Sequence, residues 1–247
     1  MTGATSGIGR AIAARLAQRG AIVAVLGRSA ERAAAVALEV KEAGGTPWIA
    51  SLDVTDAGNV EEVVKRYVAE FGGIDTVVSS AGIALTGTAT TTPVDTWRSV
   101  MATNLDGTFY LARATIPELI KTRGTFTAIS SDAGVQGACG FSAYCASKHG
   151  LQGLIKCLAL DYGSHGVRCN AVSPGFVETP MADQLFKDVS PAEIAYYKGT
   201  VPLGRFAKPA EVAEVVAHLS SSAACYTNGL IYRLDGGSTA GYYVGSA

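Results

Sequence analysis

Short apolar runs, rich in Val, Ile and Ala, alternate along this chain with longer stretches of helical periodicity. The runs lack the alternating polar residues of a strand with one solvated face, so each is expected to be covered on both sides. Buried strands that alternate with helices are typical of a doubly wound parallel sheet with helices on both faces, the Rossmann-like α/β fold. The expected strands cover residues 21–26, 48–52, 76–78, 126–129, 168–172 and 230–234.

Capping residues predict where helices begin between these strands. Ser29, Asp56 and Thr92 each stand before a helical pattern, and Ser190 with Glu193 has the spacing of a capping box. The chain contains no linker, repeat or low-complexity tract. We therefore expect a single domain over residues 1–247.

The charge balance limits the partners of the protein. The formal net charge is −1, which gives no electrostatic reason to expect nucleic acid or an anionic membrane. No apolar run reaches the about 18 to 20 residues that span a bilayer, and no leader opens the chain, so we expect a cytoplasmic protein. The five cysteines form no C-x-x-C pair, which argues against a disulfide framework and a metal site.

A glycine-rich stretch opens the chain and leads directly into a helical pattern. Gly3, Gly7 and Gly9 would let backbone amides approach a pyrophosphate, and the following helix would present its positive end. The spacing differs from the G-x-G-x-x-G fingerprint, and a lone glycine motif often marks only a structural turn. The strand and helix alternation that follows favours a dinucleotide site.

Tyr144 and Lys148 are the second candidate group. Residues four apart share a helix face, so the phenol and the ammonium would lie side by side. A neighbouring cation would pull the pKa of the phenol from about 10 toward neutrality, giving a proton donor and acceptor. A solvated surface pair is the alternative for these two residues alone. Ser131 follows the strand 126–129 and would join them at the carboxyl edge of the sheet, where ligands of this fold bind.

Taken together, these motifs resemble the short-chain dehydrogenase/reductase family, and the resemblance covers essentially the whole chain. Several ordered motifs at the family's spacing are far more specific than any one alone. The matching stretches are residues 2–9, 53–54, 81–82, 104–109, 129–131, 144–148, 173–179 and 235–237.

The resemblance implies four catalytic roles. Tyr144 would be the general acid and base, and Lys148 would lower its pKa and hold the nicotinamide ribose. Ser131 would orient the substrate oxygen. Asn104 would anchor a water molecule in the proton relay.

The same resemblance implies the cofactor site. The glycine-rich loop would hold the phosphates, Asp53 and Val54 would meet the adenine ring, and the turn at 174–179 would contact the nicotinamide. The expected cofactor-binding residues are Gly3, Thr5, Ser6, Gly7, Ile8, Gly9, Arg28, Ser29, Asp53, Val54, Ala81, Gly82, Tyr144, Lys148, Pro174, Gly175, Val177 and Thr179. Members of the family usually read N-N-A-G where this chain has Ser79-Ser80-Ala81-Gly82, so we expect reduced rigidity there without loss of activity.

The choice between NAD and NADP is predicted from charge. An Asp or Glu at the end of the second strand of such folds binds the ribose hydroxyls of NAD and repels a 2′-phosphate. This strand ends in Leu26-Gly27-Arg28-Ser29, and Arg28 could bind the phosphate as a fork. We therefore expect NADP(H), with a solvated turn arginine as the alternative.

The substrate is predicted only as a class. Residues 180–206 would form a lid, and their apolar and aromatic side chains favour a largely hydrophobic carbonyl or secondary alcohol. The overall pattern resembles 3-oxoacyl-carrier-protein reductases and ketone reductases, so the substrate could be carrier-bound. Basic residues near the entrance dock the carrier protein in that group, and Arg123 could serve here, although His165 stands where a stronger base is expected. A non-catalytic cofactor-binding protein, or an isomerase or dehydratase on the same fold, are the alternatives.

Two further expectations concern assembly and the start of the chain. The helical stretches near Phe109 and after Tyr144 are apolar on more than one face, which with the family resemblance predicts a homotetramer. The resemblance also places a central strand of about six residues before Thr2. We therefore expect that this first strand is missing from the chain and that the natural protein begins upstream of Met1. In the alternative, the neighbouring strands close the gap.

Overall fold

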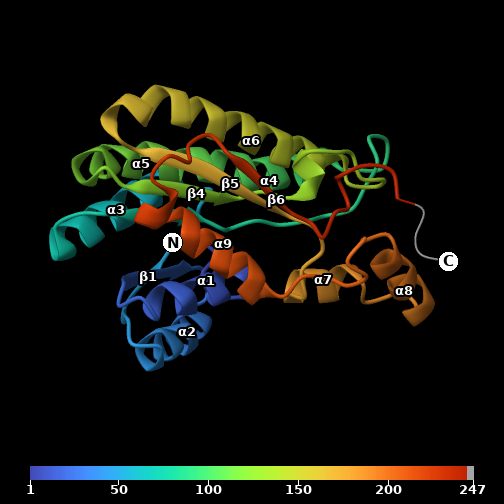
Figure 1. The fold of residues 1–247 in the computed structure, drawn as a ribbon, viewed down its shortest axis with the longest axis horizontal. Coiled ribbons are helices and arrows are strands. Elements are labelled where there is room, and N and C mark those ends of the chain that lie inside the picture. Colours follow the sequence, from blue (N-terminus) through green and yellow to red (C-terminus); the bar gives the residue numbers. More distant parts are fainter. Residues whose placement is uncertain (244–247) are drawn as a thin grey trace.

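A computed structural model describes residues 1–243, and its strands form the middle of three layers (Figure 1). The strands are β1 (Ile22–Gly27), β2 (Thr46–Ser51), β3 (Thr76–Ser79), β4 (Thr125–Ile129), β5 (Arg168–Pro174) and β6 (Ile231–Leu234). The α-helices are α1 (Gly7–Ala17), α2 (Ala30–Glu42), α3 (Ala57–Phe71), α4 (Val94–Met101), α5 (Gly107–Thr122), α6 (Ser142–Tyr162), α7 (Pro180–Leu185), α8 (Pro191–Gly199) and α9 (Pro209–Leu219). Shorter segments are the π-helical turn η1 (Ala102–Asp106) and the 3₁₀ turns η2 (Asp132–Gly134), η3 (Gly163–His165) and η4 (Ser222–Ala224).

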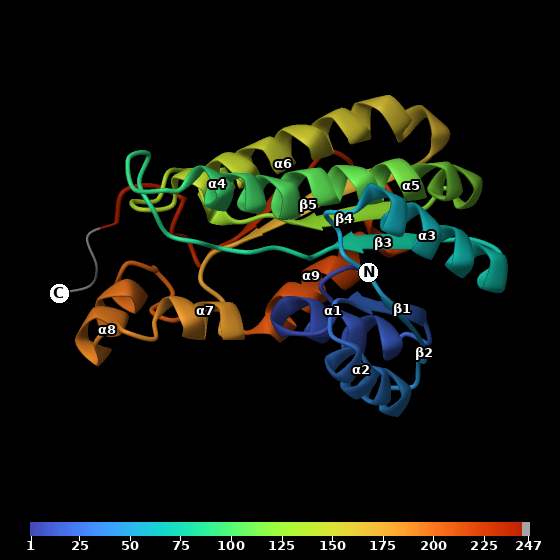
Figure 2. The same ribbon diagram turned by 180° about the vertical axis from the view of Figure 1, so that it is seen from behind.

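The helices cover both faces of the strands, as the doubly wound fold requires. Helices α3, α5 and α6 pack on one face, and α1, α2 and α9 pack on the other, which Figure 2 shows from behind. The first face buries side chains such as Val63, Leu111 and Ile155 against Phe126 of β4. Every residue of β4 is buried. The predicted α/β architecture is confirmed, and β4 lies at its core.

All six predicted strands are present, and no end differs by more than two residues. Three of the four predicted helix caps are also confirmed, because Ser29, Asp56 and Ser190 each accept a hydrogen bond from a first-turn amide. The cap at Thr92 is wrong. Helix α4 begins at Val94 after Pro93, whose side chain cannot accept a hydrogen bond.

The parallel strands lie in two sheets, one of β1 and β2 and one in the order β3-β4-β5-β6. Residues 1–4 lie between them: the Thr2 amide donates to the Val78 oxygen at 3.0 Å, and the Leu26 amide donates to the Met1 oxygen at 3.3 Å. Thr2 also forms a single parallel bridge with Ser79. Within residues 1–243, β1 and β3 do not pair with each other, and the backbone of residues 1–4 links them instead.

Helices α7 and α8 stand beside the carboxyl ends of the strands, within the expected lid segment 180–206 (Figure 1). Aromatic rings hold this segment: Phe186 lies 5.4 Å from Phe176 and 5.5 Å from Phe206, between ring centres. Within residues 1–243, no helix is long and apolar enough to cross a membrane.

Candidate active site

Ser131, Tyr144 and Lys148 meet at the carboxyl end of β4. Ser131 follows this strand and begins η2, and the first two turns of α6 carry the other two residues. The Lys148 Nζ donates to the Ile129 backbone oxygen at 2.9 Å and lies 5.6 Å from the centre of the Tyr144 ring. Lys148 is only 4% exposed. The alternative of a solvated surface pair is therefore wrong.

Asn104 lies beside this group in the π-helical turn between α4 and α5. Its Oδ1 accepts from the Ile83 amide at 2.9 Å, and its Nδ2 donates to the Ser147 Oγ at 3.0 Å. A Cβ on Gly82 would lie 3.3 Å from the Asn104 Oδ1 and 3.7 Å from the Lys148 Nζ. Such π turns often occur at functional sites, and this one brings a fully buried amide next to Gly82 and Lys148.

Burial sets the proton affinities of the two α6 side chains. Burial lowers the pKa of Lys148 to about 8. It also raises the pKa of the Tyr144 phenol to about 12, which the Ser131 hydroxyl opposes and the Asp132 carboxyl reinforces. The prediction that Lys148 pulls the pKa of Tyr144 toward neutrality is thus wrong for this structure, because desolvation of the phenol dominates. The Tyr144 phenol therefore keeps its proton at neutral pH.

The glycine-rich loop is packed too closely for larger residues. A Cβ on Gly3, whose φ is +63°, would lie 2.6 Å from the Ala81 backbone nitrogen. A Cβ on Gly9 would collide with the Gly3 carbonyl oxygen. Gly7, at φ +50°, faces Thr179, whose Cγ2 would lie 3.2 Å from a Cβ there. The loop is therefore a cradle that side chains would fill, between the end of β3 and the turn after β5.

The residues between these glycines lie at the start of α1. Ser6 is the N-cap, but its exposed side chain makes no capping hydrogen bond. Thr5 contacts Gly27 at the end of β1, where a Cβ would lie 2.7 Å from the Thr5 Cγ2. Ile8 packs into the core shared with α9. The first-turn amides of α1 thus lie in the loop itself, as a phosphate site requires.

Arg28 and Ser29 lie at the carboxyl end of β1, at the far end of the loop. Arg28 is exposed, and Ser29 caps α2 by accepting from the Arg32 amide at 3.3 Å. Hydrogen bonds from Thr55 hold the pKa of Asp53 below its usual range, and the Arg28 cation contributes to the same effect. Val54 is buried. The structure therefore brings Arg28 near Asp53, as the adenosine end of a dinucleotide site would need.

The turn after β5, residues 174–179, lies on the other side of the glycine loop from Arg28. The Gly175 amide donates to the Leu234 oxygen at 3.1 Å, just past Pro174. Val177 is buried and bridges to Ala207. Thr179 caps α7 and contacts Gly7 across the loop. The predicted cofactor residues thus follow the carboxyl ends of strands in both sheets or lie in the glycine loop and on α6. The close packing of the glycine cradle fits the phosphates of a dinucleotide.

Two other predicted residues lie elsewhere. Arg123 ends α5 and His165 lies in η3, both at the amino ends of the strands. β4 separates Arg123 from Ser131, and five strand residues span about 17 Å. The suggestion that Arg123 lies near the site entrance is therefore wrong. Arg123 borders an open cavity of about 660 Å³ on the opposite edge.

Gln152 is a site residue that the sequence analysis missed. Its Nε2 donates to the Ser130 Oγ at 3.1 Å, the Ser173 Oγ at 3.1 Å and the Ser131 carbonyl oxygen at 3.3 Å. Gln152 therefore ties α6 to the carboxyl ends of β4 and β5. Its position one turn after Lys148 is the only sequence signal that could have identified it.

Comparisons with known proteins agree with this geometry. A family model described as enoyl-(acyl carrier protein) reductase matches residues 3–239. The chain is 37% identical to 3-oxoacyl-(acyl-carrier-protein) reductase of Thermotoga maritima, over 96% of this chain and 95% of the relative. The crystal structure of levodione reductase matches with a TM-score of 0.94 at 32% identity, over 98% of this chain and 96% of that one. A variant of actinorhodin polyketide ketoreductase with NADPH matches with a TM-score of 0.93 at 34% identity, over 96% and 95%.

The matched span and the shared fold establish one class of protein, an α/β oxidoreductase. This chain belongs to the short-chain dehydrogenase/reductase family.

Proposed function

We propose that this protein is an NADP(H)-dependent oxidoreductase that interconverts a carbonyl and a secondary alcohol on a largely hydrophobic substrate. The observation that carries the proposal is the meeting of Ser131, Tyr144 and Lys148 beside a glycine cradle, at the carboxyl edge of a parallel sheet. Ligands of this fold bind at that edge. The Tyr144 phenol would therefore lie next to the nicotinamide end of a bound dinucleotide.

The chain's own residues manage the proton. In reduction, the neutral Tyr144 phenol donates its proton to the carbonyl oxygen while the Ser131 hydroxyl hydrogen-bonds to the same oxygen. The Lys148 ammonium then stabilises the phenolate until a proton returns, by way of water held near Asn104. The glycine cradle would hold a nicotinamide cofactor, which would supply the hydride for reduction and accept it in oxidation. The fold aligns the reacting groups.

Arg28 supports the choice of NADP(H). The end of β1 carries no carboxylate that would repel a 2′-phosphate, and Arg28 offers an exposed guanidinium there. The similar polyketide ketoreductase was solved with NADPH. The remaining expected contacts follow the groove: the loop residues Gly3 to Gly9 for the phosphates, Asp53 and Val54 for adenine, and the turn from Pro174 to Thr179 for the nicotinamide.

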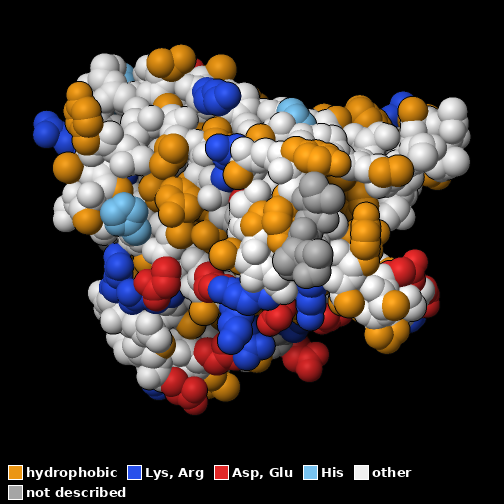
Figure 3. Space-filling view, turned by 45° about the vertical axis from the view of Figure 1, so that its right-hand side comes forward, with side chains coloured by type: hydrophobic (Ala, Val, Ile, Leu, Met, Phe, Trp, Pro, Cys, Tyr) orange, Lys and Arg blue, Asp and Glu red, His pale blue; other side chains and the backbone are white. Residues whose placement is uncertain are grey.

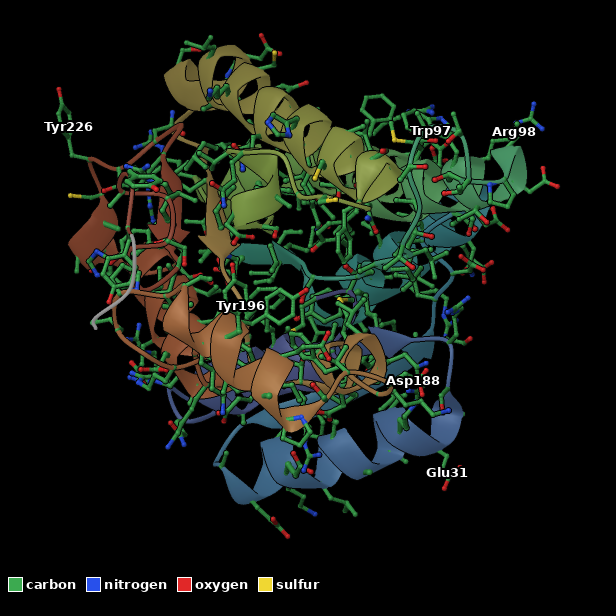
Figure 4. All side chains as sticks on the ribbon, turned by 90° about the vertical axis from the view of Figure 1, so that its right-hand side faces the viewer. Glu31, Trp97, Arg98, Asp188, Tyr196 and Tyr226 are labelled. Carbon is green, nitrogen blue, oxygen red and sulfur yellow. The ribbon has the colours of Figure 1, made fainter. Side chains whose placement is uncertain are left out.

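The lid supports an apolar substrate. Phe176, Phe186, Tyr197 and Phe206 form one aromatic cluster with ring centres 5.2 to 5.8 Å apart. Figure 4 looks onto this end of the molecule and shows Tyr196 of α8 below and to the left of Trp97 of α4. A carrier-bound 3-oxoacyl group is the second candidate, because the relative from Thermotoga maritima bears that name.

We also propose a homotetramer. Large apolar side chains stay exposed on α4, α5 and α6, among them Val94, Phe109 and Leu160, of which Leu160 is 83% exposed. Hydrophobic side chains gather over the upper part of the face in Figure 3, while charged side chains gather below. Exposed apolar patches of this kind mark contacts between subunits. Light scattering that gives a monomer at micromolar concentration would reject this.

The test of the proposed function is NADPH oxidation, followed by absorbance, with apolar ketones, polar ketones and acyl thioesters. We expect turnover with apolar ketones and a lower kcat/KM with NADH. Cofactor binding without turnover on any substrate would favour the non-catalytic alternative. Conversion of substrate without net change in the cofactor would favour an isomerase or dehydratase.

A further inference from the structure

Asp132 places a carboxyl group directly behind the hydroxyl that is to bind the substrate. The Ser131 Oγ donates to the Asp132 Oδ1 at 2.8 Å, and the Ala133 amide donates to the same oxygen at 2.8 Å. Asp132 opens η2 and is partly buried. None of the motifs that point to the family includes this carboxyl.

A serine hydroxyl has only one proton to donate. In this structure that proton is directed at Asp132, and the Ser131 Oγ also accepts from the Ala133 amide at 3.2 Å. A carbonyl oxygen in the site needs the Ser131 proton for itself, because a carbonyl can only accept. The ionised carboxylate and the substrate oxygen therefore compete for a single proton.

The surroundings of Asp132 favour its neutral form. Burial raises the pKa of this carboxyl, and the Asp235 carboxylate after β6 adds to that, while the Ser131 hydroxyl and the Ala133 amide oppose it. Tyr144 and Lys148 are the titratable groups that α6 brings to the same place. A neutral Asp132 can donate to the Ser131 Oγ and leave the serine proton free.

We propose, on the basis of the proposed function, that Asp132 is a positioning residue that decides where the Ser131 proton points. The ionised carboxylate accepts the hydrogen bond of the Ser131 hydroxyl. The protonated carboxyl leaves that hydroxyl free to donate to the substrate oxygen. Because negative charge grows on that oxygen in the transition state of either direction, loss of the serine donor slows both reduction and oxidation. Ionisation of Asp132 should lower kcat/KM about 10- to 100-fold, the value of a hydrogen bond to a charged group.

The first experiment needs no turnover. Carbon-13 labelled aspartate, assigned through neighbouring backbone amides, reports the ionisation of Asp132 in the wild type and in Ser131→Ala. Since the serine hydroxyl donates to the ionised form, its removal should raise the pKa of Asp132. An unchanged or lowered pKa would overturn the proposal, because Ser131 would then not be bound to the carboxylate.

The second experiment measures kcat/KM for ketone reduction against pH in the wild type, Asp132→Asn, Ser131→Ala and the double variant. Asp132→Asn should remove one ionisation step, because an amide does not ionise and holds the serine proton more weakly than a carboxylate does. In the Ser131→Ala background the same substitution should have no further effect. Asp161→Asn, at the exposed far end of α6, is the control and should keep the wild-type profile.

The outcomes separate the inference from the proposed function. Three results for Asp132→Asn would overturn the inference: an unchanged pH profile, an equal loss of activity at every pH, or the same effect with and without Ser131. In each case Asp132 would not position the Ser131 hydroxyl. If the wild type turns over no substrate, the proposed function fails, and the carbon-13 titration still decides whether the carboxylate holds the serine proton. If Asp132→Asn does not fold, that titration decides alone.

Discussion

The two ends of the proposed cofactor site are built in opposite ways. At the catalytic end, β4 is entirely buried, and Asn104, Lys148 and Gln152 each have hydrogen-bond partners inside the protein. At the adenosine end, β2 has a single buried residue, and Arg28 lies exposed on a two-stranded sheet. The residues proposed to transfer the proton thus lie in the core, while the residue proposed to choose the cofactor lies on the surface. The first should resist substitution, and the second should change without harm to the fold.

The connection between the two ends sharpens this contrast. Four strands share backbone ladders around the catalytic end, whereas residues 1–4 supply the strand contacts between β1 and β3. Helices α1 and α9 pack on each other across the same division and add apolar contact there. Substitutions can show how independent the two ends are.

The largest effect is expected from Tyr144→Phe, which keeps the ring and removes the phenol proton. We expect kcat for ketone reduction to fall about 10²- to 10⁴-fold. Thermal unfolding and NADPH binding should stay near wild type, because the packing of the ring is kept. Tyr226→Phe is the control, because that side chain is fully exposed, projects from the molecule in Figure 4, and borders the same cavity as Arg123. A Tyr144→Phe enzyme with normal kcat would remove the phenol from the mechanism.

Lys148 should make stability depend on pH. Its pKa falls from the ordinary 10.5 to about 8 in the folded protein, so between these values the unfolded chain binds more protons. The free energy of unfolding should therefore rise with pH across this window, by a few kcal/mol at most. Urea unfolding at about pH 8 and about pH 10 measures the rise, which Lys148→Met should remove.

Lys156→Met, on the exposed face of α6, should leave that rise in place.

Tyr144 should change the stability with the opposite sign at higher pH. Its pKa of about 12 lies above the ordinary 10, so stability should fall again as the pH rises from about 10 to about 12. A flat profile from pH 8 to 10 in the wild type would show that Lys148 is more hydrated than its burial indicates.

Gln152→Leu should weaken the catalytic end by a smaller amount. The change keeps most of the volume and leaves the hydroxyls of Ser130 and Ser173 without a buried donor. We expect a loss of about 1 to 3 kcal/mol in the free energy of unfolding. Denaturant unfolding measures it. Gln136→Leu is a matched control, because Gln136 is exposed on the loop after η2. Equal stability of the two variants would contradict the buried role of Gln152.

The smallest effect is expected at the adenosine end. Arg28→Ala should raise the KM for NADPH about 10-fold, leave the KM for NADH unchanged, and leave the unfolding temperature unchanged. Initial rates with both cofactors check this. Arg98→Ala, on the exposed face of α4, should change neither KM. A wild-type preference for NADH, or unchanged NADPH affinity in Arg28→Ala, would reject the NADP(H) assignment.

Local sequence signals predicted much of the fold. The apolar runs marked all six strands because a strand buried on both faces tolerates few polar side chains. Ser29, Asp56 and Ser190 marked helix starts because a cap depends on its own first turn. The spacing of Tyr144 and Lys148 placed both on one helix face because helical periodicity is local.

Properties that depend on residues distant in the chain were decided only by the tertiary structure. The pairing of Tyr144 with Lys148 indicated a lowered phenol pKa, but burial between β4 and α6 raised it instead. The place of Arg123 is different, because the predicted strand 126–129 already separated it from Ser131 along the chain.

The sequence by itself thus determined the strands, three of the four helix starts and the family, and it singled out the residues proposed for proton transfer. Only the tertiary structure decided their proton affinities, the role of Gln152, and the contact through which Asp132 takes the Ser131 proton. The physical reason is how far along the chain the interacting groups lie from one another. Backbone conformation and helix faces follow from neighbours in sequence, whereas desolvation and competition for a proton depend on every group that folding brings within a few ångströms.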